Sequence, residues 1–131
     1  MSGARKVTTV LPGFEHVARF WDTRLNDYLV KVKPGEYFVS QADEPISTTL
    51  GSCIAVCVRD PQAGIGGMNH FMLPAALGQS EDGGWNSGSA RYGNFAMEHL
   101  INTLFTRGAR RQRLEFKIFG GGAVLASDSR I

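Results

Sequence analysis

The chain has 131 residues, of which 43% are hydrophobic and 20% charged, and its net charge is +2. This length allows one domain with a real core, and the composition is ordinary for a globular protein. The mild charge does not indicate a nucleic-acid partner. The basic residues are scattered except in Arg107–Arg113 (RGARRQR), a cluster typical of a solvated helix end or of a docking patch for an acidic partner.

The sequence shows no sign of a membrane segment or of secretion. No apolar run approaches the roughly 18 residues of a membrane helix, and the N-terminus lacks the apolar core and cleavage site of a signal peptide. We therefore expect a cytoplasmic protein, without membrane insertion, whose thiols stay reduced. The two cysteines of CIAVC lack both a zinc spacing and a second ligand pair, so we expect no disulfide, no metal and no other cofactor.

The first 25 residues show no clear periodicity, and we predict an irregular N-terminal extension there. Pro12-Gly13 is typical of a turn, and Phe14 and Trp21 are candidate packing anchors. Two short strands are predicted next, over Tyr28–Val32 and Glu36–Ser40. The sequence KPGE separates these strands as a turn.

A helix is predicted over Arg91–Arg107, because its apolar residues recur at the spacing of an amphipathic helix. Ser89 is the candidate N-cap and Gly108 the candidate stop. Residues 75–90, rich in Gly and Ser, are predicted to form a loop. A histidine within such a helix, His99, is more often a packing or surface residue than a catalytic one.

The sequence RLEFKIF after the helix alternates like a strand and runs into GGG. This glycine run lacks the Lys-Ser/Thr of a phosphate-binding loop, so a tight turn after the strand is predicted. Strands before and after a single helix favour one mixed α/β domain over residues 1–131.

The only two cysteines and one of three histidines lie in Thr48–Pro74, TTLGSCIAVCVRDPQAGIGGMNHFMLP. SCIAVCVR and IGGMNHF read as two strands joined by a turn at Asp60–Ala63. If they pair about that turn, Cys53 lies directly opposite His70, and opposite side chains share a face of the sheet. A slip of one residue would separate the two side chains, and a bulge at the adjacent glycines would shift the register.

A thiol beside an imidazole has a defined chemistry. A free thiol titrates near pH 8.5, and a neighbouring histidine can accept its proton and leave a nucleophilic thiolate. Gly51 lets the backbone approach a substrate, and the amides of Ser52 and Cys53 are candidate oxyanion donors. Asn69, beside the histidine, completes the predicted substrate-binding set.

A third polar group usually orients the imidazole in such sites. Hydroxyls at Ser47, Thr48 and Thr49 precede the cysteine and are the candidates. The competing interpretation is that a cysteine among small apolar residues is simply a small hydrophobic residue. That interpretation is stronger for Cys57, which lies between two valines and is predicted to be core.

The sequences LGSCIAVCVRDP and GGMNHFMLP together resemble the chemoreceptor glutamine deamidase family, CheD. RYGNFAMEHLI and KIFGGG are similar to the family's later helix and strand, and LPGFEHVARFWD to the N-terminal extension of some members, so residues 1–25 are assigned to that extension. The resemblance implies a layered α/β domain with a mixed, mostly antiparallel sheet, related to toxin-type glutamine deamidase domains.

The resemblance also implies an activity, a protein-glutamine glutaminase that uses a cysteine nucleophile. The enzyme would convert selected glutamine side chains of methyl-accepting chemotaxis receptors to glutamate, releasing ammonia, and some relatives bind a CheC-type phosphatase. Cys53 matches the family's nucleophile and His70 its general acid/base. The family's third catalytic residue, a threonine six positions before the cysteine, corresponds to Ser47, with Thr48 as the alternative.

The chain departs from the family in length, because family members continue past Ile131 with a further helix and strands. The C-terminal part of the family domain is therefore expected to be absent. The alternative function is a catalytically incomplete binding module that docks on a chemoreceptor or on the CheC phosphatase. Cysteine peptidase or transglutaminase-like chemistry uses the same nucleophile, but no feature of the sequence indicates a peptide cleft or an amine-acceptor site.

Overall fold

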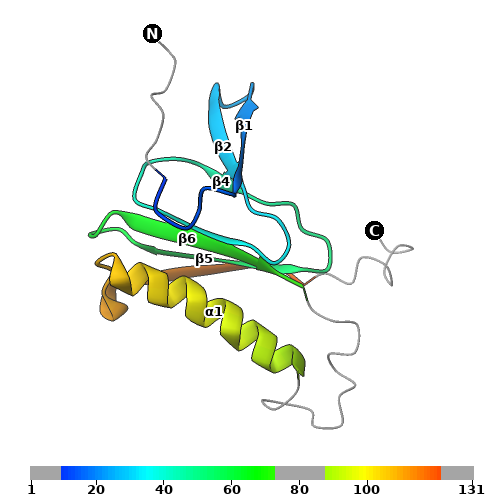
Figure 1. Ribbon diagram of the computed structural model, residues 1–131, viewed down its shortest axis with the longest axis vertical. Coiled ribbons are helices and arrows are strands. Elements are labelled where there is room, and N and C mark those ends of the chain that lie inside the picture. The colour runs from blue at the N-terminus through cyan, green and yellow to red at the C-terminus, as the bar shows by residue number, and fades with distance from the viewer. Residues whose placement is uncertain (1–9, 73–87, 122–131) are drawn as a thin grey trace.

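The computed structural model describes residues 10–72 and 88–121. This part of the chain contains a four-stranded sheet, of order β3-β6-β5-β7, and a three-stranded sheet, of order β1-β2-β4 (Figure 1). Every neighbouring pair is antiparallel except β2 and β4. The elements are β1 (Ala18–Asp22), β2 (Asp27–Lys31), β3 (Tyr37–Ser40), β4 (Ile46–Ser47), β5 (Ile54–Asp60), β6 (Ile65–Phe71), α1 (Gly88–Thr106), a 3-10 turn (Arg111–Arg113) and β7 (Glu115–Gly120).

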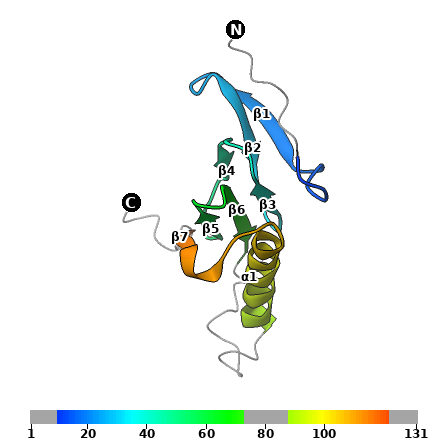
Figure 2. The same cartoon turned by 90° about the vertical axis from the view of Figure 1, so that its left-hand side faces the viewer.

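The predicted layered α/β arrangement with mostly antiparallel strands is confirmed, but the strands are divided between two sheets. Helix α1 packs on one face of the four-stranded sheet, over β6 and β3. The ribbon of β1 and β2 projects away from the helix, as the two perpendicular views show (Figures 1 and 2). The candidate site draws on both sheets: His70 lies in β6 of the four-stranded sheet, and Thr48 follows β4 of the three-stranded sheet.

Close contact between α1 and β6 depends on a glycine. A Cβ atom at Gly67 would lie 2.6 Å from the Phe38 carbonyl oxygen and 2.8 Å from Leu100 Cδ1, so no side chain fits there. Leu100 and Leu104 are fully buried above this position. Since full burial of a leucine side chain stabilises a fold by about 1.5–3 kcal/mol, these contacts fix the helix on the sheet.

The turn between β5 and β6 is organised by a buried carboxylate. Asp60 has no solvent exposure, and it accepts hydrogen bonds from the backbone N–H groups of Gln62, Ala63 and Arg110 at 2.9–3.1 Å. The Arg113 guanidinium bonds both of its oxygens, at 2.9 and 3.0 Å. This guanidinium holds the pKa of the Asp60 carboxyl well below its usual range. One residue of the predicted basic cluster is thus part of the fold.

The prediction of an irregular segment over residues 1–25 is wrong in part, because Ala18–Asp22 forms β1 and pairs with β2. The predicted turn at Pro12-Gly13 is present, and Phe14 is buried as expected. Trp21 is not a core anchor. It is 45% exposed and packs edge-on against Tyr28, with ring centroids 5.2 Å apart.

Helix α1 begins three residues before the predicted start, so Ser89 lies within the helix instead of capping it. Its predicted end at Gly108 is confirmed. Gly108 has a φ of 106°, and the N–H of Ala109 donates to the Leu104 carbonyl, the return bond of a glycine-terminated helix. Most of the predicted loop over residues 75–90 lies outside the described residues. Within 10–72 and 88–121, no helix has the length and apolar character needed to cross a membrane.

Candidate active site

The hairpin register differs from the predicted one by two residues. His70 lies opposite Ala55 instead of Cys53, because Asp60 pairs with Ile65 and not with Ala63. The loop is longer than a two-residue turn, with Gly64 at a φ of 69°. A shift of two residues preserves the side of the sheet to which each side chain points. Cys53 and His70 are therefore diagonal neighbours along one face.

Cys53 lies directly before β5 and is partly exposed. Its carbonyl accepts a hydrogen bond from the Gly121 N–H at 2.9 Å. This bond continues by one position the pairing of β5 with β7, in which Ile54 lies opposite Gly120. Cys53 thus extends the line of the strand, and diagonal neighbours in an antiparallel pair lie about 7–8 Å apart. The described structure has no hydrogen bond between the Cys53 thiol and His70 Nε2.

His70 is held by the hydroxyl of Thr48, the residue directly after β4. Its Nδ1 lies 2.7 Å from Thr48 Oγ1, and that hydroxyl donates to the Val32 carbonyl at 2.6 Å. A hydroxyl has one proton to donate, so Thr48 accepts at the imidazole, and Nδ1 carries the ring proton. The neutral tautomer with its lone pair on Nε2 follows from this arrangement.

The Nε2 atom of His70 is buried and has no hydrogen-bond partner among the described residues. The side chain is 2% exposed, and burial lowers the pKa of His70, opposed in part by the Val32 carbonyl. Nearly all buried polar atoms of native proteins are paired, so an unpaired one requires an explanation. A buried, neutral imidazole with a free lone pair is suited to accept a proton.

The structure separates the two hydroxyl candidates for orienting the imidazole. Thr48 contacts the ring, whereas Ser47 Oγ donates to the Val30 carbonyl at 3.2 Å, within the second sheet. Thr49, the third hydroxyl, is exposed. Of these three hydroxyl residues, Thr48, five positions before Cys53, is the one that contacts His70.

Asn69 lies on the opposite face of the sheet from His70. Its Oδ1 accepts from the Val56 N–H at 3.0 Å, and its Nδ2 lies 3.4 Å from Met97 Sδ of α1. It is 1% exposed. The structure therefore does not bring Asn69 to the imidazole, while Gly51 and Ser52 are exposed in the bend directly before Cys53.

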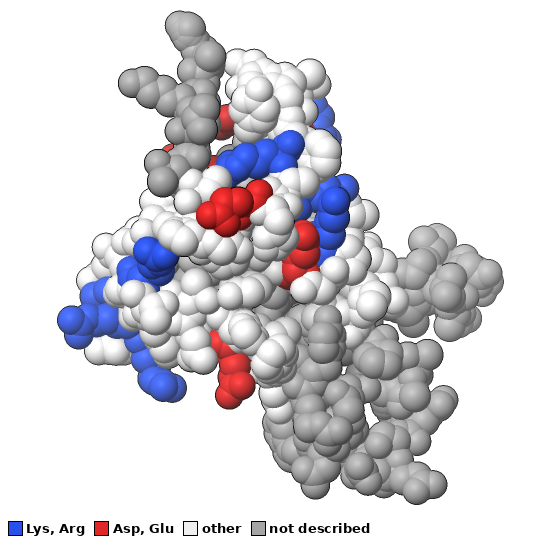
Figure 3. Space-filling model, in the orientation of Figure 1, with Lys and Arg blue, Asp and Glu red and all other residues white. Residues whose placement is uncertain are grey.

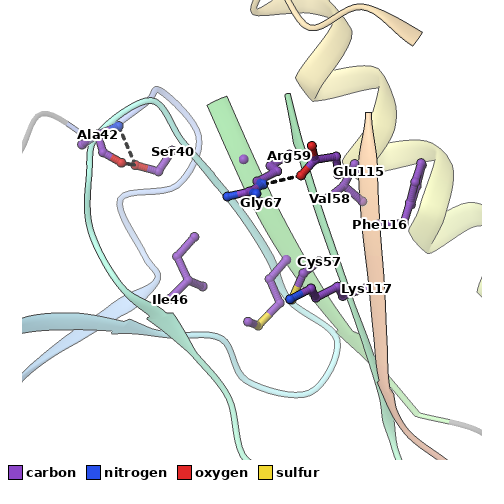
Figure 4. A pocket seen from close by; sticks show the side chains of 12 residues that line it. Ser40, Ala42, Ile46, Cys57, Val58, Arg59, Gly67, Glu115, Phe116 and Lys117 are labelled. Atoms are coloured by element: carbon purple, nitrogen blue, oxygen red, sulfur yellow. Dashed lines mark hydrogen bonds and ion pairs between the residues drawn. The ribbon is translucent and has the colours of Figure 1, made fainter. Parts of the chain in front are cut away.

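A pocket of about 510 Å³ lies on the same face as His70, further along β5 and β6 (Figure 4). Cys57, Met68 and Lys117 line it, and Arg59 pairs with Glu115 at its rim, at 2.7 Å. The prediction that Cys57 is a core residue, made from its flanking valines, is wrong, because its side chain is only half-buried. Burial raises the pKa of its thiol, and Lys117 opposes this change.

Two contacts of the site had no clear signal in the sequence. One is the Val32 carbonyl, which fixes the Thr48 hydroxyl and depends on the pairing of distant segments. The other is Gly121, whose N–H bonds the Cys53 carbonyl. Its signal was the run GGG after a strand, which predicted a tight turn but not what the turn contacts.

Metal-binding groups and charge add no further candidate site. In the described segments, no cluster of three or more His, Cys, Asp or Glu residues has the geometry to hold a metal ion. Basic and acidic side chains are interspersed on the face in Figure 3, with a basic group at the side where α1 ends. Arg111, in the turn after α1, lies over the Phe105 ring, at 5.8 Å from its centroid.

Comparison with known proteins assigns the chain to a family. A family model described as CheD chemotactic sensory transduction matches residues 72–131. Relatives named probable chemoreceptor glutamine deamidase CheD are 51% identical in Saccharophagus degradans, over 96% of this chain, and 51% identical in Halorhodospira halophila, over 92%. One in Rhodopseudomonas palustris is 54% identical over 89%. The resemblance seen in the sequence is confirmed, and the chain belongs to the CheD family.

The relatives are longer than this chain. It spans 59%, 56% and 54% of the lengths of these three proteins. Their alignments extend over most of the chain and include the segment with Cys53 and His70.

Proposed function

We propose that this chain is a protein-glutamine deamidase that converts selected glutamine side chains of methyl-accepting chemotaxis receptors to glutamate, releasing ammonia, in chemotaxis adaptation. The names of the relatives support the substrate class. The observation that carries the chemistry is the buried His70 imidazole, which Thr48 holds with its Nε2 lone pair free. Such a group can deprotonate a thiol on the same face of the hairpin once that thiol comes within hydrogen-bond reach of Nε2.

The reaction assigned to these residues has two stages. The Cys53 thiol gives its proton to His70 Nε2, and the sulfur attacks the glutamine carboxamide carbon to form a tetrahedral oxyanion. The imidazolium then donates that proton to the departing nitrogen, so that ammonia leaves and a thioester remains. Water, deprotonated by the same imidazole, attacks the thioester, and the returned proton restores the thiol as glutamate leaves.

The residues around this pair take supporting roles in the proposal. The amides of Ser52 and Cys53 stabilise the oxyanion, and Gly51 leaves room for the substrate. Thr48 takes the orienting role that sequence position gives to Ser47, because its hydroxyl is the one that contacts the ring. Asn69 contributes by holding β5 and α1 to β6 instead of contacting the substrate.

Three finer expectations belong to this proposal. The domain is related to toxin-type glutamine deamidase domains, the protein works in the cytoplasm, and a CheC-type phosphatase is a partner. Each expectation rests on the family resemblance.

The test uses a purified chemoreceptor cytoplasmic domain as substrate. Ammonia release is measured for the wild-type chain, Cys53→Ala and Cys57→Ala, and receptor peptides are analysed for the gain of about one dalton that converts glutamine to glutamate. The two cysteines make a matched pair, since the chain contains no others. We expect Cys53→Ala to abolish release and Cys57→Ala to retain it, because loss of a nucleophile removes the covalent route.

Two outcomes would contradict the proposal. Release that survives in Cys53→Ala would exclude Cys53 as the nucleophile. No release from a wild-type chain with a cooperative unfolding transition would favour the alternative, a binding module, which pull-down with the receptor domain or with a CheC-type phosphatase would then detect.

A further inference from the structure

The C-terminal end of β7 lies against the loop that carries Cys53. Strands β5 and β7 pair so that Gly120 lies opposite Ile54, and the N–H of Gly121 donates to the Cys53 carbonyl at 2.9 Å. Cys53 is thus held from the side of β7, whereas His70 lies on β6 at its other side. The two strands that flank β5 supply different contacts to the candidate site.

No side chain fits at Gly120. A Cβ atom there would lie 2.2 Å from the Cys53 carbonyl oxygen, a separation that real Cβ atoms do not show, and 3.2 Å from Leu50 Cδ1. Gly120 also has a φ of 100°, which L-residues rarely adopt. Backbone atoms cannot rotate away as a flexible side chain can, so any substitution must displace the peptide that follows Cys53.

The steric requirement for glycine is weaker at Gly121 than at Gly120. Its φ is 78°, but a Cβ atom there would meet only Ile54 side-chain atoms, at 3.9 and 4.0 Å, which are ordinary contacts. Gly120 must therefore be glycine because its backbone lies so close to Cys53. Gly121 contributes its backbone conformation and the N–H group that bonds the Cys53 carbonyl. Together they form a clamp on one peptide group.

The loop needs such a clamp because it is poorly buried. Gly51 and Ser52 are exposed, and Cys53 is only partly buried. Reaction geometry demands that a nucleophile be held to a fraction of an ångström, and a misplacement of about 1 Å can lower a rate about a hundredfold. An exposed loop attains this precision only where its backbone is fixed from outside.

We propose that Gly120 and Gly121 are positioning residues for the Cys53 thiol: the end of β7 clamps the Cys53 carbonyl and thereby fixes the thiol relative to His70. This inference rests on the proposed function of Cys53. The two glycines touch neither substrate nor reacting atoms. They act through the backbone of the nucleophile loop.

The test compares Gly120→Ala with Gly108→Ala. Gly108 has a nearly equal φ, 106° against 100°, but a Cβ atom there meets nothing within 4 Å, and it lies at the end of α1. Both variants therefore carry the same backbone strain, and only Gly120→Ala disturbs Cys53. Thermal unfolding, kcat and KM for glutamine deamidation, and the rate of iodoacetamide alkylation of Cys53 relative to Cys57 at pH 7 are measured for each.

For Gly120→Ala we expect kcat to fall at least about tenfold with KM nearly unchanged, because chemistry is misaligned while substrate contacts remain. Alkylation of Cys53 should slow relative to Cys57. Gly108→Ala should lower the unfolding midpoint by less, because it carries the backbone strain without the clash, and leave kcat and the alkylation ratio unchanged. A Gly120→Ala protein with wild-type kcat, or an equal loss in both variants, would overturn the inference.

Gly121→Ala keeps the test decisive if Gly120→Ala does not fold. It introduces no backbone clash, so a folded protein with a smaller change of kcat and alkylation ratio in the same direction supports the clamp, and no change in either overturns it. The alkylation ratio does not depend on turnover. A wild-type chain that releases no ammonia would therefore contradict the proposed function, while the ratio would still decide whether the clamp positions Cys53.

Discussion

The two ends of the β5–β6 hairpin both bury a titratable side chain, but they treat it in opposite ways. At the turn, every oxygen of Asp60 is bonded to a backbone N–H or to Arg113. At the open end, His70 is bonded on one nitrogen only, and its Nε2 has no partner among the described residues. The turn end has complete hydrogen bonding, and the open end leaves one buried atom unpaired within residues 10–72 and 88–121.

Within this hairpin, the turn end contributes to the stability of the fold, and the open end supplies a group suited to chemistry. A fully bonded buried carboxylate is costly to disturb, since removing one partner leaves the other unpaired. An unpaired buried nitrogen weakens the fold but leaves a lone pair available to a substrate or a thiol. Proteins commonly accept such local losses at functional sites, and the turn end supplies compensating stability.

The largest effect is expected from His70→Leu. This change removes the proton acceptor, and general acid–base catalysis contributes about 10²- to 10⁴-fold to rates, so kcat for deamidation should fall by about 10³-fold. The unfolding midpoint should stay the same or rise, because the unpaired nitrogen is lost. Ammonia release and thermal unfolding measure the two quantities. His99→Leu, an exposed histidine on α1, is the control and should change neither; a large loss of stability in His70→Leu would contradict the comparison.

Asp60→Asn tests the other end. Breaking a buried, bonded ion pair is expected to raise the unfolding equilibrium constant roughly a hundredfold or more, while kcat of the folded fraction stays unchanged. Urea unfolding measures the first and ammonia release the second. Glu115→Gln removes one partner of the exposed Arg59 pair and should change the unfolding constant less than about fivefold. Equal changes of the unfolding constant in the two variants would show that burial of the Asp60 carboxylate adds nothing to its contribution to stability.

Thr48→Val should give the next effect. It removes the hydroxyl that bonds Nδ1 and fixes the tautomer, so kcat should fall on the order of tenfold, and Thr48→Ser should restore most of it. Ser47→Ala is the matched control, because its hydroxyl bonds the Val30 carbonyl. A larger loss in Ser47→Ala than in Thr48→Val would return the orienting role to Ser47.

The smallest expected effect is on the pH dependence of stability, to which His70 and Asp60, at the two ends of the hairpin, contribute in different pH ranges. Both groups have lowered pKa values in the folded protein, so the unfolded chain binds protons first as the pH falls, and stability declines. For His70 this decline begins below about pH 6.5, and for Asp60 below about pH 4. Stability curves from pH 8 to 3 should lose the first decline in His70→Leu and the second in Asp60→Asn, and the acid limb of kcat/KM should lie below pH 6.5.

Most of the fold was predictable because its strands and helix have strong local patterns. Both short strands around KPGE, the hairpin strands, the helix and β7 follow from alternation or helical periodicity. Strand β1 was missed because it belongs to a projecting ribbon with Phe20 and Trp21 exposed, so burial imposes little pattern on its sequence. A strand that packs on no core has no apolar alternation to read.

The site was predictable in its residue types but not in its geometry. Side chains alternate between the two faces of a strand, so the sequence was sufficient to place Cys53 and His70 on one face. The register was not predictable, because it depends on a loop in which the Asp60 side chain accepts from the N–H groups of Gln62 and Ala63. The choice between Ser47 and Thr48 depended on the short parallel pairing of β2 with β4. No local pattern encodes contacts between segments so far apart.

The clamp at the end of β7 also has a consequence for protein synthesis. The loop with Cys53 leaves the ribosome several seconds before Gly120 and Gly121 do, since synthesis proceeds at about 5–20 residues per second. A nascent chain can therefore pair β5 with β6 while its thiol is still held from one side only. The order of the strands along the chain therefore makes completion of the nucleophile loop wait for the synthesis of β7.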